Sequence, residues 1–361
     1  MNWTTFHTDQ TTTLRITCKQ HEITQYSIRP SRLKIESQTL DNNRLQLEIL
    51  PGQKVSVEFS ENVKEYAFTG PPFGIPVVMD PLMIFAAPQP RHSIPGKNPE
   101  NIVKIPPGIH AHEQTVGLSP GTLANKSALN IPESKEVVVF TPGIHKLGYW
   151  QVANHIKHTH IEAGAIVYGA FDILPAGREP DQMDITESYR DKWHQEPLRE
   201  TFKISGSGVL SGSKLPWHLK KDFTYHQHDH YWAHIKLLQL PVRKISLSDV
   251  TLCDAPYWTL TFMNDADTRT TGTFDNFKIV GSWTYNNDGL LLPRNGVIRN
   301  AFIHADDDAF KISHSNAQIE NCVVWQNSNG AVFQFGWFPK TLSQIQLLKL
   351  TNLGSVKEQR H

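Results

Sequence analysis

Three aspartates near the C-terminal end of the sequence, Asp288, Asp307 and Asp308, are of a type and spacing that could do chemistry. Carboxyls held close together repel one another when they are ionised, which raises the pKa of at least one of them. One carboxyl can then donate a proton while the others activate water, and this division of work is used to hydrolyse glycosidic bonds. The trio therefore predicts acid–base hydrolysis, provided that the fold brings the three side chains together.

The segment around these aspartates contains a repeat that would bring them together. Residues 298–308 superpose on residues 319–329 with an offset of 21 residues, each copy being a short apolar run followed by a polar Asn/Asp cluster. One copy earlier, the same order places Asp288 in the turn that Asp307 and Asp308 occupy. Such repeats are typical of a parallel β-helix, whose coils stack about 4.8 Å apart. The three carboxyls are then expected within roughly 5–9 Å of one another.

Aspartate and asparagine are also ordinary turn residues, and that reading suffices for Asp306. The set Asp288, Asp307 and Asp308 is assigned to catalysis instead, because mutually repelling carboxylates are a poor way to stabilise a turn.

The motifs around the aspartates resemble those of glycoside hydrolase family 49. The resemblance rests on Asn287-Asp288-Gly289, Pro293, His304, Asp307-Asp308-Ala309, Lys311, Ser315, Ala317 and Gln334-Phe335-Gly336-Trp337. That family contains dextranases and isopullulanases, which are inverting enzymes with a β-sandwich in front of a right-handed parallel β-helix. The resemblance implies an endo-acting hydrolase of an α-glucan with dextran-type or pullulan-type linkages. It also implies that Asp307 is the general acid, with Asp308 and Asp288 as the base.

Four further residues lie within one coil of the aspartates and are expected to contact sugar: His304, Lys311, Trp325 and Trp337. Lys311 is expected to donate to a sugar hydroxyl. Trp325 follows two valines, so a position in the core is an equally good interpretation for it. No cofactor and no metal ion is expected at this site.

Two other functions remain open from the sequence. The pattern of one Asp followed by a double Asp also occurs in polygalacturonases, but their downstream His and Arg-x-Lys signature is not visible here. Pectin carboxylates also call for a basic cleft, and the predicted turns offer Lys311 and few other cations. The second alternative is a catalytically impaired carbohydrate-binding β-helix. It arises because the chain ends soon after Trp337, so we expect a C-terminally shortened helix whose last coil is exposed.

Composition excludes several classes of partner. The 35 basic and 35 acidic side chains balance, so nothing favours nucleic acid or an anionic membrane. No apolar stretch is long enough to span a membrane, and the three cysteines fit neither a disulfide framework nor a zinc spacing. We expect a monomer that acts on a polysaccharide or oligosaccharide. The first residues show no signal peptide, whereas the family resemblance implies an extracellular location.

Three segments are predicted to position the site, and together they predict an all-β fold. Residues 1–92 contain alternating strands, of which Leu45–Ile49 and Val55–Phe59 are read as a hairpin of an N-terminal β-sandwich. Residues 93–135 are rich in Pro, Gly and Ser and are read as a connecting segment. Residues 136–361 carry the coil repeat and correspond to the right-handed parallel β-helix of the resembled family.

Two further features belong to the predicted turns. Alternate histidines in residues 226–230 would share one face of a strand, as metal ligands can, but no second ligand cluster accompanies them. We therefore interpret this segment as a loop of aromatic and imidazole groups beside a sugar cleft. Asn276, Asn300 and Asn321 recur at equivalent positions of successive coils and predict an internal amide ladder with a structural role.

Overall fold

The computed structural model describes most of the chain. The described ranges are residues 2–19, 21–66, 75–78, 81–89, 98–119, 122–180, 197–215, 235–262, 270–281, 286–312, 314, 316–327, 330–335, 348–351 and 354–355. Within them the regular structure is β-strand apart from three short 3₁₀ helices, so the predicted all-β class is confirmed. These helices are Ser31–Leu33, Ser60–Asn62 and Pro99–Asn101. Over the same ranges, no helix is long and apolar enough to cross a membrane.

Two compact units make up the chain: Met1–Arg91 with Gly354–His361, and His92–Leu353. The strands of the first range are β1 (Asn2–His7), β2 (Thr12–Thr17), β3 (Tyr26–Arg29), β4 (Ser37–Asp41), β5 (Arg44–Ile49), β6 (Lys54–Phe59), β7 (Val63–Tyr66), β8 (Ile75–Val78) and β9 (Leu82–Ala87). They form one sheet in the order β1-β9-β6-β3, a second in the order β2-β5-β4, and the pair β7-β8. Leu45 and Leu47 from the second sheet share a buried core with Val55 and Val57 from the first, as expected for a β-sandwich.

The predicted hairpin in this unit is wrong. The two alternating strands exist as β5 and β6, but β5 pairs with β2 and β4, whereas β6 pairs with β3 and β9. The turn between them crosses from one sheet to the other. Alternation shows only that one face of each strand is buried, and two strands that face the same core from opposite sheets have the same pattern.

The second unit is a parallel β-helix with three ladders of stacked strands. Its strands are β10 (Ile102–Ile105), β11 (Gly108–Ile109), β12 (Ala111–Ser119), β13 (Thr122–Ser127), β14 (Val137–Phe140), β15 (Gly143–Val152), β16 (His158–Ile161), β17 (Ala165–Ile173), β18 (Arg199–Ser205), β19 (Val209–Ser211), β20 (Leu238–Gln239), β21 (Val242–Ser248), β22 (Thr251–Cys253), β23 (Leu260–Thr261), β24 (Thr271–Asp275), β25 (Lys278–Val280), β26 (Leu290–Leu292), β27 (Val297–Arg299), β28 (Phe302–Ala305), β29 (Phe310–Ile312), β30 (Ala317–Glu320), β31 (Val323–Gln326), β32 (Phe333–Phe335) and β33 (Leu348–Thr351); β34 (Gly354–Ser355) follows in the chain.

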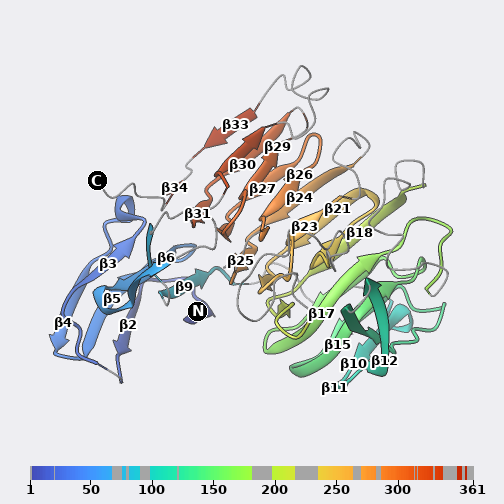
Figure 1. Cartoon of the computed structure of the whole chain (residues 1–361), viewed down its shortest axis with the longest axis horizontal. Coiled ribbons are helices and arrows are strands. Elements are labelled where there is room, and N and C mark those ends of the chain that lie inside the picture. Colours follow the sequence, from blue (N-terminus) through green and yellow to red (C-terminus); the bar gives the residue numbers. More distant parts are fainter. Residues whose placement is uncertain are drawn as a thin grey trace. The chain divides into compact units, whose positions relative to one another are not determined.

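The first ladder has the order β10-β14-β16-β18-β21-β24-β27-β30-β33. The second runs β17-β19-β22-β25-β28-β31 and the third runs β17-β20-β23-β26-β29-β32, so the long strand β17 belongs to both. The ladders follow the chain from green β17 to red β33 (Figure 1). One strand from each ladder makes a coil, as β27, β28 and β29 do. The predicted β-helix is therefore confirmed.

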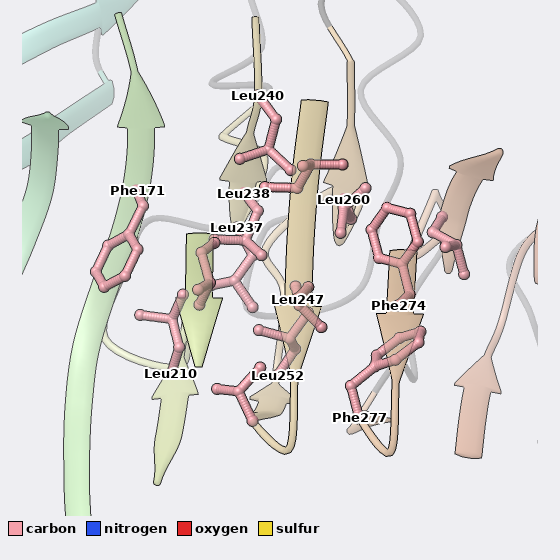
Figure 2. Close-up of a cluster of buried hydrophobic side chains, with 14 of the residues drawn as sticks. Phe171, Leu210, Leu237, Leu238, Leu240, Leu247, Leu252, Leu260, Phe274 and Phe277 are labelled. Atoms are coloured by element: carbon pink, nitrogen blue, oxygen red, sulfur yellow. The ribbon is translucent and has the colours of Figure 1, made fainter. Parts of the chain in front are cut away.

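The interior of the helix is filled by apolar residues that stack from coil to coil. Stacked pairs from the second, third and first ladders are, respectively, Leu210–Leu252, Leu238–Leu260 and Leu247–Phe274. All six side chains are buried and point into one continuous core (Figure 2). Because every coil buries its apolar residues only against its neighbours, the register of one strand fixes the register of the next.

Residues 93–135 are more than a connection between domains. Ile102 pairs with Val137, so β10 already belongs to the first ladder, and Gly108 pairs with His145 in the neighbouring strand β15. The Pro, Gly and Ser residues of the segment give it the composition of a linker, which conceals its strands in the sequence.

The predicted amide ladder is present in part. Asn276, Asn300 and Asn321 all have left-handed backbone conformations, with φ of 51°, 53° and 51°. The Nδ2 of Asn321 donates to Oδ1 of Asn300 at 2.6 Å, but Asn300 donates to Asp275 at 2.7 Å and not to Asn276. Carboxylates thus replace some of the expected amide acceptors.

Replacing Asn300 with alanine is expected to destabilise the protein by about 2–3 kcal/mol. The substitution removes two side-chain hydrogen bonds, and it places alanine in the left-handed backbone region, where its Cβ atom is strained and no side-chain hydrogen bond compensates. Urea unfolding measures the loss. Asn300→Gly is the matched control, since glycine adopts the same backbone conformation without strain and should lose only the hydrogen bonds. Equal stability of the wild type and the alanine variant would contradict this structural role.

Candidate active site

The register of the third ladder brings the three predicted catalytic aspartates together. Leu290 pairs with Phe310, which places Asp288 and Asp308 at equivalent positions of neighbouring coils. The amide of Gly289 donates to the carbonyl of Asp308 at 2.9 Å. One carboxylate oxygen from each of Asp288, Asp307 and Asp308 lies within 4.8 Å of the others. We call this group the carboxylate trio, and its close spacing agrees with the coil superposition.

Side-chain amides from the same and the next coil hold the backbone that carries the trio. Asn287 is fully buried, and its Nδ2 donates to the carbonyls of Ala255 at 2.7 Å and Tyr257 at 3.1 Å. Gln326, on the following coil, donates to the carbonyl of Asp307 at 2.7 Å. Hydrogen bonds to the preceding coil and from the following coil therefore hold the turns, which limits movement of the carboxyls.

Lys311 places a positive charge inside the trio. Its Nζ lies 2.7 Å from Oδ2 of Asp288 and 3.3 Å from Oδ2 of Asp308, and it donates to Oε1 of Gln334 at 3.1 Å. Asp308 and Gln334 accept hydrogen bonds from the ammonium, while Asp288 is its ion-pair partner. The geometry therefore gives Lys311 a role in holding the carboxylates, and its predicted donation to a sugar hydroxyl stays a prediction. Three carboxylates could also hold a divalent cation, but the Lys311 ammonium already brings positive charge to that place.

The carboxyls of Asp307 and Asp308 differ in exposure. Asp308 is buried, and its Oδ1 accepts from the amide of Ala331 at 3.0 Å. Asp307 is only partly buried, and its Oδ1 accepts from the amide of Asp308 at 2.9 Å. Asp288 is buried like Asp308. Within the trio, Asp307 is thus the carboxyl that an incoming ligand can reach most directly.

Burial raises the pKa of two members of the trio. Burial, reinforced by the charges of Asp307 and Asp308 and opposed by Lys311, raises the pKa of Asp288 to about 8. Burial and the charge of Asp308 also raise the pKa of Asp307. Burial alone would lower the pKa of Lys311, but the three carboxylates outweigh it and raise that pKa. Near neutral pH the site therefore keeps a proton on a carboxyl and the charge on Lys311.

Asp307, the general acid that the family resemblance implies, is not the carboxyl with the most raised pKa. Asp288 has the larger rise because it is more deeply buried than Asp307, and desolvation is the main cause for both.

Trp258 belongs to the site and was missed in the sequence. Leu260 pairs with Leu290, so Trp258 occupies the position of Asp288 one coil earlier. Its ring centroid lies 4.5 Å from Nζ of Lys311. The coil between Trp258 and Asp288 takes 30 residues, against an offset of 21 in the repeat that was read. Because this coil is longer, the 21-residue repeat does not align Trp258 with Asp288. Only the pairing of Leu260 with Leu290 shows that the two positions are equivalent.

The other predicted sugar contacts are placed differently. His304 and Trp325 are neighbours on β28 and β31, both are buried, and their rings lie 5.2 Å apart. Burial lowers the pKa of His304 to about 3, and its Nε2 pairs with Nδ2 of Asn327 at 2.9 Å. Their contact with sugar stays a prediction, and the burial favours the core alternative for Trp325. Trp337 and the histidines of residues 226–230 lie outside the described residues.

Fold and site together define a class of protein: a parallel β-helix with a carboxylate trio on one ladder, preceded in the chain by a β-sandwich. No family model matches the chain. It is 26% identical over 354 residues to a dextranase of Arthrobacter sp. (strain CB-8), covering 91% of this chain and 50% of that protein. It is 24% identical over 304 residues to an isopullulanase of Aspergillus niger, covering 81% of this chain and 46% of that protein.

The solved structure of Dex49A from Penicillium minioluteum superposes with a TM-score of 0.68 at 18% identity, covering 98% of this chain and 59% of that one. This likeness supports the fold. The chain spans about half the length of the curated relatives it matches. Because these relatives are dextranases and an isopullulanase, the resemblance to glycoside hydrolase family 49 is confirmed.

Proposed function

We propose that this chain is an endo-acting glycoside hydrolase that cleaves an α-glucan with inversion of the anomeric configuration. The observation that carries the proposal is the carboxylate trio within 4.8 Å, with a lysine ammonium among the carboxylates. The substrate class follows from the names of the relatives, since dextran and pullulan are both neutral α-glucans. The monomeric state and the extracellular location stay predictions.

In the proposed mechanism Asp307 is the general acid. Its partial exposure lets it reach the glycosidic oxygen, and its raised pKa favours the protonated form that must donate. Asp308 and Asp288 are assigned as the base from the family resemblance, and both carboxyls lie beside the Lys311 ammonium. Because the pKa of Asp288 is raised to about 8, Asp288 can serve as base only in the fraction of the enzyme in which it is ionised. One of them takes a proton from water as the water attacks the anomeric carbon, and Asp307 gives its proton to the departing oxygen. The reaction uses one water molecule and restores the total number of protons.

The stereochemistry is a separate question. Inverting glycosidases usually hold their two carboxyls roughly 6.5–9.5 Å apart, whereas retaining enzymes hold them about 5–5.5 Å apart. The closest oxygens of this trio lie within 4.8 Å, which is nearer to the retaining spacing. Inversion is therefore proposed from the family resemblance, and a retaining mechanism with a carboxylate nucleophile is the second candidate that this spacing favours.

Two measurements test these proposals. A reducing-end assay on dextran, pullulan and polygalacturonate should show cleavage of an α-glucan and none of polygalacturonate. Binding of dextran without cleavage would instead support a carbohydrate-binding β-helix. Proton NMR of the first product released should show inverted configuration, and retained configuration would replace the proposed roles by the covalent mechanism.

A further inference from the structure

Trp258 and Lys311 make a contact that the proposed mechanism does not yet use. The Nζ of Lys311 lies 4.5 Å from the centroid of the Trp258 ring, and Asp288 and Asp308 are its ion-pair partners. A second ammonium, that of Lys236, lies 5.4 Å from the same ring. The face of an indole ring carries partial negative charge and attracts a cation, most strongly where water is excluded. Lys311 is buried, so the contact is of the stronger kind.

The ring itself is held in place by the catalytic coil. The Nδ2 of Asn287 donates to the carbonyl of Tyr257, the residue before Trp258. The amide of Thr259, the residue after it, donates to the carbonyl of Asp288 at 3.0 Å. The Tyr257 ring also stacks on Trp258, with centroids 5.4 Å apart and an interplanar angle of 9°. Trp258 thus stands on a short segment whose two ends are tied to the residues that carry the trio.

We propose that Trp258 is a positioning residue that acts through Lys311, its ring fixing the ammonium beside Asp288 and Asp308 and thereby setting the protonation of the carboxylate trio. This inference rests on the proposed function. The charged groups that face the ammonium are Asp288, Asp307 and Asp308, with Lys236 on the shared ring. Without the ring, the ammonium gains freedom to move, and it stabilises the ionised carboxylates less well.

The test compares Trp258→Leu and Trp258→Phe with the wild type in glucan hydrolysis as a function of pH. The leucine variant is expected to lose roughly tenfold in kcat with little change in KM, because a desolvated cation–π contact is lost. The acid limb of its pH profile should move to higher pH, since the carboxylates that must be ionised have a weaker counter-charge. The phenylalanine variant, which keeps a smaller π-face, should recover part of both effects.

Tyr257→Leu is the matched control. It removes the stacked neighbour but leaves the ring beside Lys311, so its acid limb should stay in place even where its activity falls. A Trp258→Leu variant with higher KM but an unchanged acid limb would show that the ring contacts sugar instead. A lower melting temperature with unchanged limbs would show that the ring is only structural. Either result overturns the proposal.

A readout without substrate separates this inference from the proposed function. The tryptophan fluorescence of the wild type minus that of Trp258→Phe should change with pH as the trio titrates, and the change should shift in a Lys311→Met background. A difference signal that does not titrate overturns the inference even if the wild type hydrolyses dextran. A titrating signal in a chain that cleaves no glucan would support the inference and remove the proposed hydrolase function.

Discussion

Replacing Asp307 with asparagine is expected to lower kcat on an α-glucan roughly a thousandfold, within the range for loss of a general acid. The amide has nearly the same shape but cannot supply the proton that the departing glycosidic oxygen needs. Asp307 is the partly exposed member of the trio, so the change should leave the fold intact. Initial rates from a reducing-end assay measure the loss, and thermal unfolding confirms that the variant is folded.

The general-acid role can be tested with a substrate whose leaving group needs no proton. An α-glucosyl fluoride has a leaving group that departs without a proton, so Asp307→Asn should lose far less activity on such a substrate than on a polymer. An equal loss on both would assign Asp307 to the water-activating side of the reaction. Asp306→Asn is the matched control, because it makes the same substitution one residue away from the trio. Full activity of Asp307→Asn on the polymer would remove Asp307 from the mechanism.

The β-helix and the trio could be predicted from the sequence because the coils that carry them have nearly constant length. Ile298 pairs with Ile319 and Ala305 pairs with Gln326, as the offset of 21 residues requires. From Phe310, which pairs with Phe333, the offset becomes 23 residues. The two additional residues fall in the sequence between β31 and β32, where they leave the apolar strand pattern unchanged. The repeat was therefore visible although the register was not exact.

The features that were missed depend on spatial pairing that no local pattern records. Trp258 stands in the site because β23 stacks on β26, and the longer coil between them conceals this from the sequence. The sequence indicates Lys311 as a site residue, but its partners can be identified only from the register of three coils, since Gln334 lies on β32. Burial, which raises the pKa of Asp288, is likewise set by the folded surroundings and not by neighbours in the chain.

Replacing Lys311 with methionine should give the largest loss of stability, and the loss should depend on pH. Methionine keeps the apolar stem but leaves Asp288 and Asp308 buried without their ammonium partner. Removal of one partner from a buried ion pair typically costs about 3–5 kcal/mol. We expect a loss of this size at pH 8, together with loss of activity, because the ionised carboxylates then repel one another without a counter-charge.

The sign of the pH dependence follows from the raised pKa of Asp288. Its pKa is about 8 in the folded protein against an ordinary value of 3.8, so the folded state prefers the protonated form and this group's contribution to stability falls as pH rises from about 4 to 8. At pH 4 Asp288 holds its proton and the raised pKa of Asp307 favours its protonated form too, so Lys311 faces less negative charge than at pH 8. The Lys311→Met loss should therefore shrink or reverse at pH 4. Urea unfolding at both pH values measures it, with Lys244→Met at an exposed position of β21 as the control. A loss that is equal at pH 4 and pH 8 would show that Lys311 stabilises the site by packing and not by charge.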